Sequence, residues 1–492
     1  MMAWGSRKGS GPDLRMAAPR LRVLLLAMPD VASCFDRVMR FPNLGLTSLA
    51  GNLDHAEVRI LDLVTRARDV GRAVRETLAG LAPDLVGLSA MTFQYHTATQ
   101  VAAIVREACP NAHLVLGGYH ATLAYEQIAG DPAAAPFDYL IRGEGEVALN
   151  RLVQALRSGG REEDIAGLSY RTPAGFVHNP RASLLDVNAL RLPARGARLS
   201  SRFFYFGRPF DVVETSRGCT RTCRFCCIHR MYGPQHRTYS LERVIADIQA
   251  AADNGAQGIF FADDNINLDP DRLIALCQAI VSAGLDRLEY VSQADVGGFA
   301  RAPELAPAMR RAGFSGLFLG IESTAQENWK FLRKSNSYAR TREVIRHLRA
   351  NGLAVAGGFI VGNPDEDAGA LRGIFRAARS LEMDHAIMWC LTPYPGTEVR
   401  EELLAEGLVT NPDDFRWYNG YICNLRTRHL THRQLVRGLA TEGLKLYFHP
   451  QFMFRGRLWG HDGHSLRPYL EASLEYLTHG YRNRLYASRH RL

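Results

Sequence analysis

The sequence lacks any long hydrophobic run. No apolar stretch in its 492 residues approaches the roughly 18 residues that a membrane-spanning helix needs. The first 20 residues are rich in Gly, Ser, Ala, Arg and Pro and contain no hydrophobic segment of a signal peptide. We therefore expect residues 1–20 to form a disordered tail and the protein to be cytoplasmic.

Lysine is scarce, and arginine supplies nearly all of the 59 basic residues, which exceed the 50 acidic ones and give a net charge of +9. This balance permits an acidic partner, such as a phosphate, an anionic lipid surface or nucleic acid, but a solvated basic surface is the simpler explanation. We expect no nucleic-acid partner. Charged residues at 22% and hydrophobic residues at 47% are ordinary for a globular protein, and the length suggests two or three domains.

The cysteine pattern does not predict a disulfide framework either. Of the nine cysteines, four stand close together at positions 219, 223, 226 and 227, and the rest are scattered. In a cytosolic chain such tight spacing indicates metal or redox chemistry rather than structural disulfides.

The N-terminal part alternates short apolar runs with segments of helical periodicity. Continuous apolar runs separated by helices predict a parallel sheet covered on both faces. The expected strands are residues 23–28, 58–63, 85–89, 113–118 and 139–142. Five such units predict a doubly wound, flavodoxin-like α/β domain over residues 21–160, with its ligand site at the carboxyl ends of the strands.

Residues 161–204 contain scattered Pro, Gly and Ala, and we interpret them as a linker. A second alternation of strands and helices follows, and six βα units at roughly 30-residue spacing predict a partial TIM-type barrel over residues 205–400. Its expected strands are residues 211–216, 258–262, 288–293, 316–322, 354–361 and 386–391, and its expected helices include 241–252, 271–283, 341–351 and 368–381. Residues 401–492 are predicted to be a helical, basic and aromatic C-terminal region.

Three cysteines, Cys219, Cys223 and Cys226, follow the first strand of the predicted barrel, where barrel active sites are built. Three thiolates this close can bind one small inorganic cluster, and three rather than four leave one iron open to another ligand. The alternative is a structural zinc site with His229 or Cys227 as the fourth ligand. Zinc knuckles usually pair two Cys-x2-Cys units, and this sequence lacks the second unit.

The Cys-x3-Cys-x2-Cys spacing, with Phe225 before the third cysteine, resembles the radical S-adenosylmethionine (SAM) superfamily. The resemblance covers roughly residues 205–400. It implies a [4Fe–4S] cluster on Cys219, Cys223 and Cys226, whose open iron chelates SAM. It also implies reductive cleavage of SAM to a 5′-deoxyadenosyl radical that takes hydrogen from carbon.

The same resemblance implies SAM contacts at the ends of the later strands. Carboxylates suit the amino group and the ribose hydroxyls of SAM, and glycine permits close approach to the adenine. Helix capping by the acidic residues before Pro270 is the alternative interpretation. The residues implied are Asp263, Asp264, Asn265, Ser292, Gln293, Glu322, Gly358 and Ile360.

Motifs at residues 116–122 and 142–146 resemble the cobalamin-binding domain that precedes many radical SAM domains. The implied cofactor-binding residues are Ser89, Thr92, Gly117, Gly118, His120, Thr122, Gly143 and Glu144. The loop at residues 29–36 contains no histidine, so cobalamin would be bound without an axial histidine from that loop.

Three functions are compatible with these patterns. The first is a cobalamin-dependent radical SAM methylase. The second is a radical SAM oxidative cyclase, similar to the anaerobic Mg-protoporphyrin IX monomethyl ester cyclases, or another tailoring enzyme of a tetrapyrrole, lipid or natural product. The third is a non-enzymatic corrinoid- or metal-binding protein, which six barrel units and an intact cysteine triad disfavour.

We expect as partners a small-molecule substrate, apolar or lipid in character, and an electron donor such as flavodoxin or ferredoxin. Residues 447–459 mix aromatic residues with arginine. They predict either contact with a membrane surface or an amphipathic helix packed on the barrel.

Overall fold

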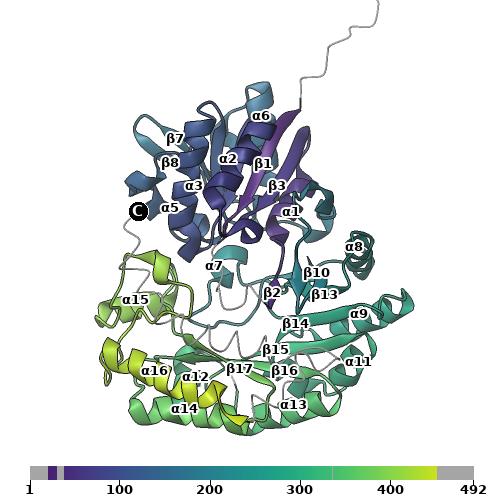
Figure 1. Cartoon of the computed structure of the whole chain (residues 1–492), viewed down its shortest axis with the longest axis vertical. Helices are drawn as coiled ribbons and strands as arrows, with labels where there is room; N and C mark the ends of the chain where they lie inside the picture. The colour runs from purple at the N-terminus through teal and green to yellow at the C-terminus, as the bar shows by residue number, and fades with distance from the viewer. Residues whose placement is uncertain (1–19, 30–37, 335, 451–492) are drawn as a thin grey trace, which may run out of the picture.

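The computed structural model describes residues 20–29, 38–334 and 336–450, and its two large sheets lie one above the other in Figure 1. The first sheet has the strand order β3-β1-β4-β5-β6-β7-β8. Its five parallel strands are β1 (Leu21–Ala27), β3 (Ala56–Asp62), β4 (Leu85–Ser89), β5 (His113–Gly117) and β6 (Tyr139–Ile141). All five coincide with predicted strands, and the doubly wound fold class is confirmed.

Alternate residues of β1 pack on opposite faces of this sheet. Leu24 and Leu26 pack in the core shared with α2 (Val70–Leu81) and α3 (Tyr95–Ala108). Val23 and Leu25 pack in the core shared with α1 (Leu44–Asn52) and α6 (Gly145–Ser158). Burial on both faces explains why β1 is a continuous apolar run instead of an alternating one.

The segment expected to be a linker carries two further strands. β7 (Leu168–Thr172) and β8 (Gly175–His178) form an antiparallel hairpin at the edge of the first sheet. Pro173 and Ala174 form the tight turn of this hairpin, and Gly175 begins β8. Later residues do lie across both sheets, since Leu199 donates its N–H to Ile60 and the buried Arg195 pairs with Asp211 at 3.2 Å.

The second sheet is an open half-barrel with the order β17-β16-β15-β14-β13-β10-β9-β2. Its six parallel strands match the six predicted ones, so the partial barrel is confirmed. They are β10 (Arg208–Val213), β13 (Gly258–Phe261), β14 (Glu289–Asp295), β15 (Phe314–Glu322), β16 (Ala354–Val361) and β17 (His385–Cys390). Two short antiparallel strands, β9 (Phe204–Tyr205) and β2 (Met39–Arg40), complete one edge. Although β2 follows β1 in the chain, it joins this second sheet and thereby ties the two domains together.

Helices cover the outer face of the half-barrel (Figure 1). They are α8 (Leu241–Asp253), α9 (Pro270–Ser282), α11 (Leu305–Arg311), α13 (Tyr338–Ala350) and α14 (Ala368–Ser380). Several of these helices begin with a side chain that accepts a hydrogen bond from a free backbone N–H group of the first turn. The Ser240 side chain accepts from the backbone N–H of Arg243, and the Asp269 side chain accepts from that of Arg272. Asp269 is followed by Pro270, whose fixed φ suits the first helical position.

The C-terminal region is only partly helical. It has α15 (Glu398–Ala405) and α16 (His432–Tyr447), the latter packed on α14, with mostly irregular chain between them. The aromatic and basic segment at 447–459 lies mostly outside the described residues, as does the tail at 1–20. In the described ranges no helix is long and apolar enough to cross a bilayer.

Candidate functional site

The four clustered cysteines occupy a loop at the carboxyl end of β10. The loop begins after β11 (Ser216–Arg217), which pairs with β12 (Arg237–Thr238). Gly218 starts it with φ +84°, and a Cβ there would lie 2.2 Å from the carbonyl oxygen of Gln235. Only glycine can make this turn, so the backbone geometry that presents the following cysteines depends on it.

The thiols of the loop are shielded from water to different extents. Cys219 is buried, whereas Cys223 and Cys226 are half-buried. Burial raises the pKa of all three thiols, although nearby Lys334 and Arg221 oppose the rise at Cys219 and Cys223. Because thiolates are the ligands, a bound metal cluster would have to displace these protons.

The side chains that a zinc site would need are not arranged as a ligand set. The His229 imidazole donates from Nε2 to the Cys219 carbonyl oxygen at 2.7 Å, and burial raises the pKa of Cys227 to about 12. Among the residues that the structure describes, no three His, Cys, Asp or Glu side chains converge on a single metal ion. Ligands of an iron–sulfur cluster bind different irons and need not converge on one point, so the three thiols fit a cluster better.

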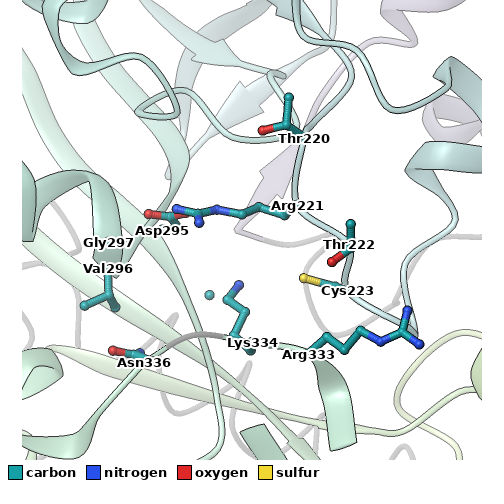
Figure 2. A pocket seen from close by; sticks show the side chains of 11 residues that line it. Thr220, Arg221, Thr222, Cys223, Asp295, Val296, Gly297, Arg333, Lys334 and Asn336 are labelled. Carbon is teal, nitrogen blue, oxygen red and sulfur yellow. The ribbon is translucent and has the colours of Figure 1, made fainter. Parts of the chain in front are cut away.

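A cavity of about 240 Å³ lies beside the cysteine loop (Figure 2). Cys223 points into it opposite Lys334, whose Nζ donates to Glu322 Oε1 at 2.9 Å. On its other side the guanidinium of Arg221 pairs with Asp295 at 2.8 Å. Burial disfavours the charge on Lys334, but Glu322 outweighs this effect and raises the pKa of Lys334. The cavity is therefore lined by charged groups of both signs, as a zwitterionic ligand requires.

Glu322 lies at the end of β15 in a strained conformation. Its φ is +66°, and the pairing of β15 with β16 shifts register between Gly320 and Glu322. A non-glycine residue with positive φ costs free energy that the surrounding structure has to supply. The prediction selected Glu322, but it missed Lys334, Arg221 and Asp295, because nothing in their spacing marks them as neighbours of Glu322.

The three polar residues after β13 differ in how they are engaged. Asp263 accepts hydrogen bonds from Thr215 N (3.0 Å), Thr215 Oγ1 (2.7 Å) and Ser216 Oγ (2.5 Å), which joins the ends of β10 and β13. Asp264 accepts from Gly218 N at 2.9 Å, and burial raises its pKa to about 7. Asn265 donates to Asp295 at 3.1 Å, while its buried Oδ1 has no hydrogen-bond partner among the described residues. Asp264 and Asn265 thus keep free capacity for a ligand, whereas Asp263 does not.

The remaining predicted SAM contacts lie at or near the ends of β14 and β16. The Ser292 hydroxyl is buried and has no partner among the described residues, and the Gln293 side chain is exposed. Gly358 is explained by packing, because a Cβ there would lie 2.3 Å from the Phe318 ring. Ile360 is buried in the main core of the half-barrel.

A second cavity, of about 470 Å³, opens at the carboxyl ends of β1, β4, β5 and β6. Five of the predicted cobalamin contacts line it, namely Ser89, Gly117, Gly118, Gly143 and Glu144. Gly118 has φ +91°, and a Cβ there would lie 2.8 Å from the Ala90 carbonyl oxygen. This glycine-lined floor at a topological switch point fits a large planar cofactor with a tail.

Three predicted contacts are not among the residues that line this cavity. Thr92 is buried in a 3-10 turn, and Thr122 accepts from Gly143 N and donates to Gly118 O, both at 2.9 Å. His120 packs against the rings of Tyr95 and Phe415, and burial lowers its pKa to about 4. The loop predicted to lack an axial histidine falls mainly on residues 30–37, outside the described residues.

The cavity of the first domain continues to the cysteine-bearing domain, which contributes Glu214, Arg217, Tyr232 and Asp264 to its lining. Arg217 pairs with Glu144 (3.1 Å) and Glu146 (2.7 Å) of the first domain and with Glu214 of its own. Glu144 also pairs with Arg237 at 2.9 Å. Glu144 therefore holds the domains together as well as lining the cavity, a role that local sequence does not reveal.

Both domains match known families. Residues 35–153 match the B12 binding domain, and residues 213–378 match the Radical SAM superfamily.

The chain is 29% identical over 449 residues to an uncharacterized methyltransferase of Pyrococcus horikoshii, covering 89% of this chain and 95% of that protein. It is 28% identical over 381 residues to the anaerobic magnesium-protoporphyrin IX monomethyl ester cyclase of Cereibacter sphaeroides, with coverages of 76% and 61%. The hopanoid C-3 methylase of Methylococcus capsulatus is 28% identical over 381 residues, with coverages of 73% and 68%.

Solved structures share the two-domain fold. The radical SAM methyltransferase TsrM of Kitasatospora setae, with tryptophan substrate and a SAM analogue bound, superposes with a TM-score of 0.69 at 19% identity and covers 95% of this chain and 98% of that one. The same enzyme with cobalamin and a [4Fe–4S] cluster bound gives a TM-score of 0.65 at 21% identity, with coverages of 80% and 76%.

Proposed function

The chain belongs to the B12-binding radical SAM family, and from this premise we propose that it transfers a methyl group to a carbon atom of a small-molecule substrate. It is a cobalamin-dependent radical SAM enzyme, and its relatives include both methyltransferases and cyclases. A reductant and a substrate are the partners that such an enzyme needs.

The observation that carries the proposal is the cavity shared by the two domains. Strand-end loops of the B12-binding domain form one wall of this cavity. The other wall includes Arg217, which directly precedes the cysteine loop, and Asp264, which accepts a hydrogen bond from Gly218 N in that loop. A methyl carrier in this cavity and a radical source on the cysteines would act on one substrate held between them. This proximity is what a methyl transfer to an activated carbon requires.

The residues of the chain have separate tasks in this scheme. Cys219, Cys223 and Cys226 would hold the [4Fe–4S] cluster, and Lys334, Glu322, Asp264 and Asn265 offer charged and polar partners for SAM. Ser89, Gly117, Gly118 and Gly143 leave room for cobalamin. When bound, cluster and SAM supply radical activation of a C–H bond, and cobalamin supplies methyl transfer. The protein orients the reactants and excludes water.

The similarity to the Cereibacter sphaeroides cyclase supports oxidative cyclisation as the second candidate. The substrate in either case is proposed to be an apolar, lipid or tetrapyrrole-like small molecule, and contact of the C-terminal region with a membrane surface stays a prediction. A flavodoxin or ferredoxin is the proposed electron donor.

The test is an anaerobic assay of the full chain reconstituted with iron, sulfide and cobalamin, using SAM that carries an isotopic label in its methyl group. Methylation predicts a product heavier by one labelled methyl group in place of hydrogen, together with both 5′-deoxyadenosine and S-adenosylhomocysteine. Formation of 5′-deoxyadenosine and an unlabelled, oxidised product would favour the cyclase. A chain that binds cobalamin but never cleaves SAM would contradict both candidates.

A further inference from the structure

A surface rich in arginine adjoins the cysteine loop. Arg221, Arg301, Arg333 and Arg340, here called the arginine face, come from the cysteine loop, the end of α10 (Val296–Arg301), the residue after α12 (Gln326–Leu332) and the first turn of α13. Arg221, Arg301 and Arg340 line a hollow of about 250 Å³ with Gly297 and Ala300 and without any acidic residue. This hollow shares Arg221 and Gly297 with the cavity drawn in Figure 2.

The positive charge of the arginine face is only partly neutralised. Arg221 pairs with the buried Asp295, and Arg333 pairs with Glu398 at 2.8 Å. Arg301 and Arg340 are exposed and form no ion pair with any carboxylate of the described residues. Two uncompensated charges beside two paired ones leave this surface net positive.

The arginine face is also where the cysteine loop reaches the surface. Thr220 and Thr222 are exposed on either side of Arg221, and the neighbouring Cys223 lines the adjacent cavity. Since the rate of electron transfer falls steeply with distance, an electron entering here would travel only a short way to a cluster on Cys223.

We propose that the arginine face is the docking surface for an acidic one-electron donor protein of the flavodoxin or ferredoxin kind. This inference rests on the proposed function, because it needs a cluster on the cysteine loop. Redox partners form small, transient interfaces, and complementary charge mainly raises their rate of encounter. A few unpaired arginines around a shallow hollow suit such a contact, whereas a tightly bound partner would need a large apolar surface.

The experiment compares three electron donors on the reconstituted full chain by stopped-flow absorbance of the cluster. They are a reduced bacterial flavodoxin, reduced methyl viologen as a small cation, and dithionite as a small anion. The test variant is Arg301→Gln with Arg340→Gln, and the matched control is Arg372→Gln with Arg376→Gln, two exposed arginines of α14 on the outer helical layer. Arg340→Gln alone serves as a milder second variant.

We expect the test variant to be reduced by flavodoxin about tenfold more slowly at low ionic strength, the lower end of the range for electrostatic steering. The difference should vanish near 1 M salt, where the Debye length is about 3 Å. Reduction by methyl viologen, and the control variant with all donors, should be unchanged. Arg340→Gln alone should show a smaller loss of the same kind.

An unchanged rate with flavodoxin in the test variant would overturn the docking surface. Equal slowing by flavodoxin and dithionite would overturn it too, since it would identify a site for small anions. If the wild-type chain were not reduced by any donor, the cluster assignment, and with it the proposed function, would be the failed premise.

Discussion

Arg217 of the cysteine-bearing domain donates to Glu146 of the B12-binding domain at 2.7 Å, and both side chains are buried. Arg217 stands two residues before Cys219, so this ion pair connects the proposed cluster loop directly to the wall of the proposed cobalamin cavity. The relative placement of the two cofactor sites thus depends on a buried charge pair.

Arg217→Met should destabilise the chain by roughly 3–5 kcal/mol, because it leaves Glu146 and Glu214 buried without their cation. Denaturant unfolding followed by circular dichroism measures this loss. In the double variant Arg217→Met with Glu146→Gln, the loss should be smaller than the sum of the two single losses. Additive effects would mean that the pair does not couple the domains.

Cys223→Ala should abolish iron binding and SAM cleavage, since the thiolate is required as a cluster ligand. Iron content, absorbance near 400 nm and 5′-deoxyadenosine formation report the result. Cys277→Ala, on α9 in the buried core of the half-barrel, is the matched control and should keep all three. Full SAM cleavage by the Cys223 variant would refute the cluster assignment.

Glu322→Ala should weaken SAM binding by about 1.5–3 kcal/mol, roughly ten- to a hundredfold, through loss of a charge-assisted partner. The Lys334 ammonium would also lose the carboxylate that it contacts at 2.9 Å, and with it its orientation. Calorimetry on the reconstituted protein measures the change, with Glu327→Ala on the exposed surface of α12 as the control. Unchanged affinity would leave Glu322 with a purely structural role.

Gly118→Val should eliminate cobalamin binding and leave the iron–sulfur cluster intact. A side chain at φ +91° is strained, and its Cβ would press on the Ala90 backbone at the floor of the cavity. Gly117→Ala is the milder comparison, because the nearest atom to a Cβ there is 4.0 Å away. Cobalamin retained at full stoichiometry in Gly118→Val would remove the cavity from the proposed site.

Bound cobalamin should be base-off and without nitrogen ligation from His120. His120→Phe keeps a ring between Tyr95 and Phe415 and should leave the cobalamin spectrum and the Co(II) electron paramagnetic resonance unchanged. Loss of a nitrogen coupling in this variant would identify His120 as an axial ligand.

The same variant tests the pH dependence of stability. Burial lowers the pKa of His120 to about 4, so the unfolded chain binds a proton there at higher pH than the folded one. The stability that the neutral, buried His120 contributes is therefore complete above about pH 6.5 and is lost as the pH falls towards 4. Between pH 7 and pH 4.5 the free energy of unfolding should therefore fall by about 2–3 kcal/mol less in His120→Phe than in the wild type, as measured by urea unfolding. Parallel pH profiles would contradict this.

The sequence by itself determined the fold class and the position of the cysteine loop. Apolar runs such as residues 23–28 and 354–361 are continuous enough to predict buried parallel strands. Cys219, Cys223 and Cys226 directly follow another predicted strand, residues 211–216, and their spacing is visible within eight residues of sequence. Parallel topology then places strand-end residues at one edge, which is why Glu322, Asp264 and Gly118 could be selected from their positions in the chain alone.

Only the tertiary structure decided which of these residues face a cavity and what lies opposite them. Thr92 and His120 follow the right strands but pack elsewhere, because the direction of a side chain depends on packing against distant elements such as Phe415. Lys334 beside Cys223, Arg217 beside Glu146 and β2 in the second sheet join residues far apart in the chain. Such contacts form only when the strands of the half-barrel assemble or the two domains dock, and no local pattern of sequence encodes them.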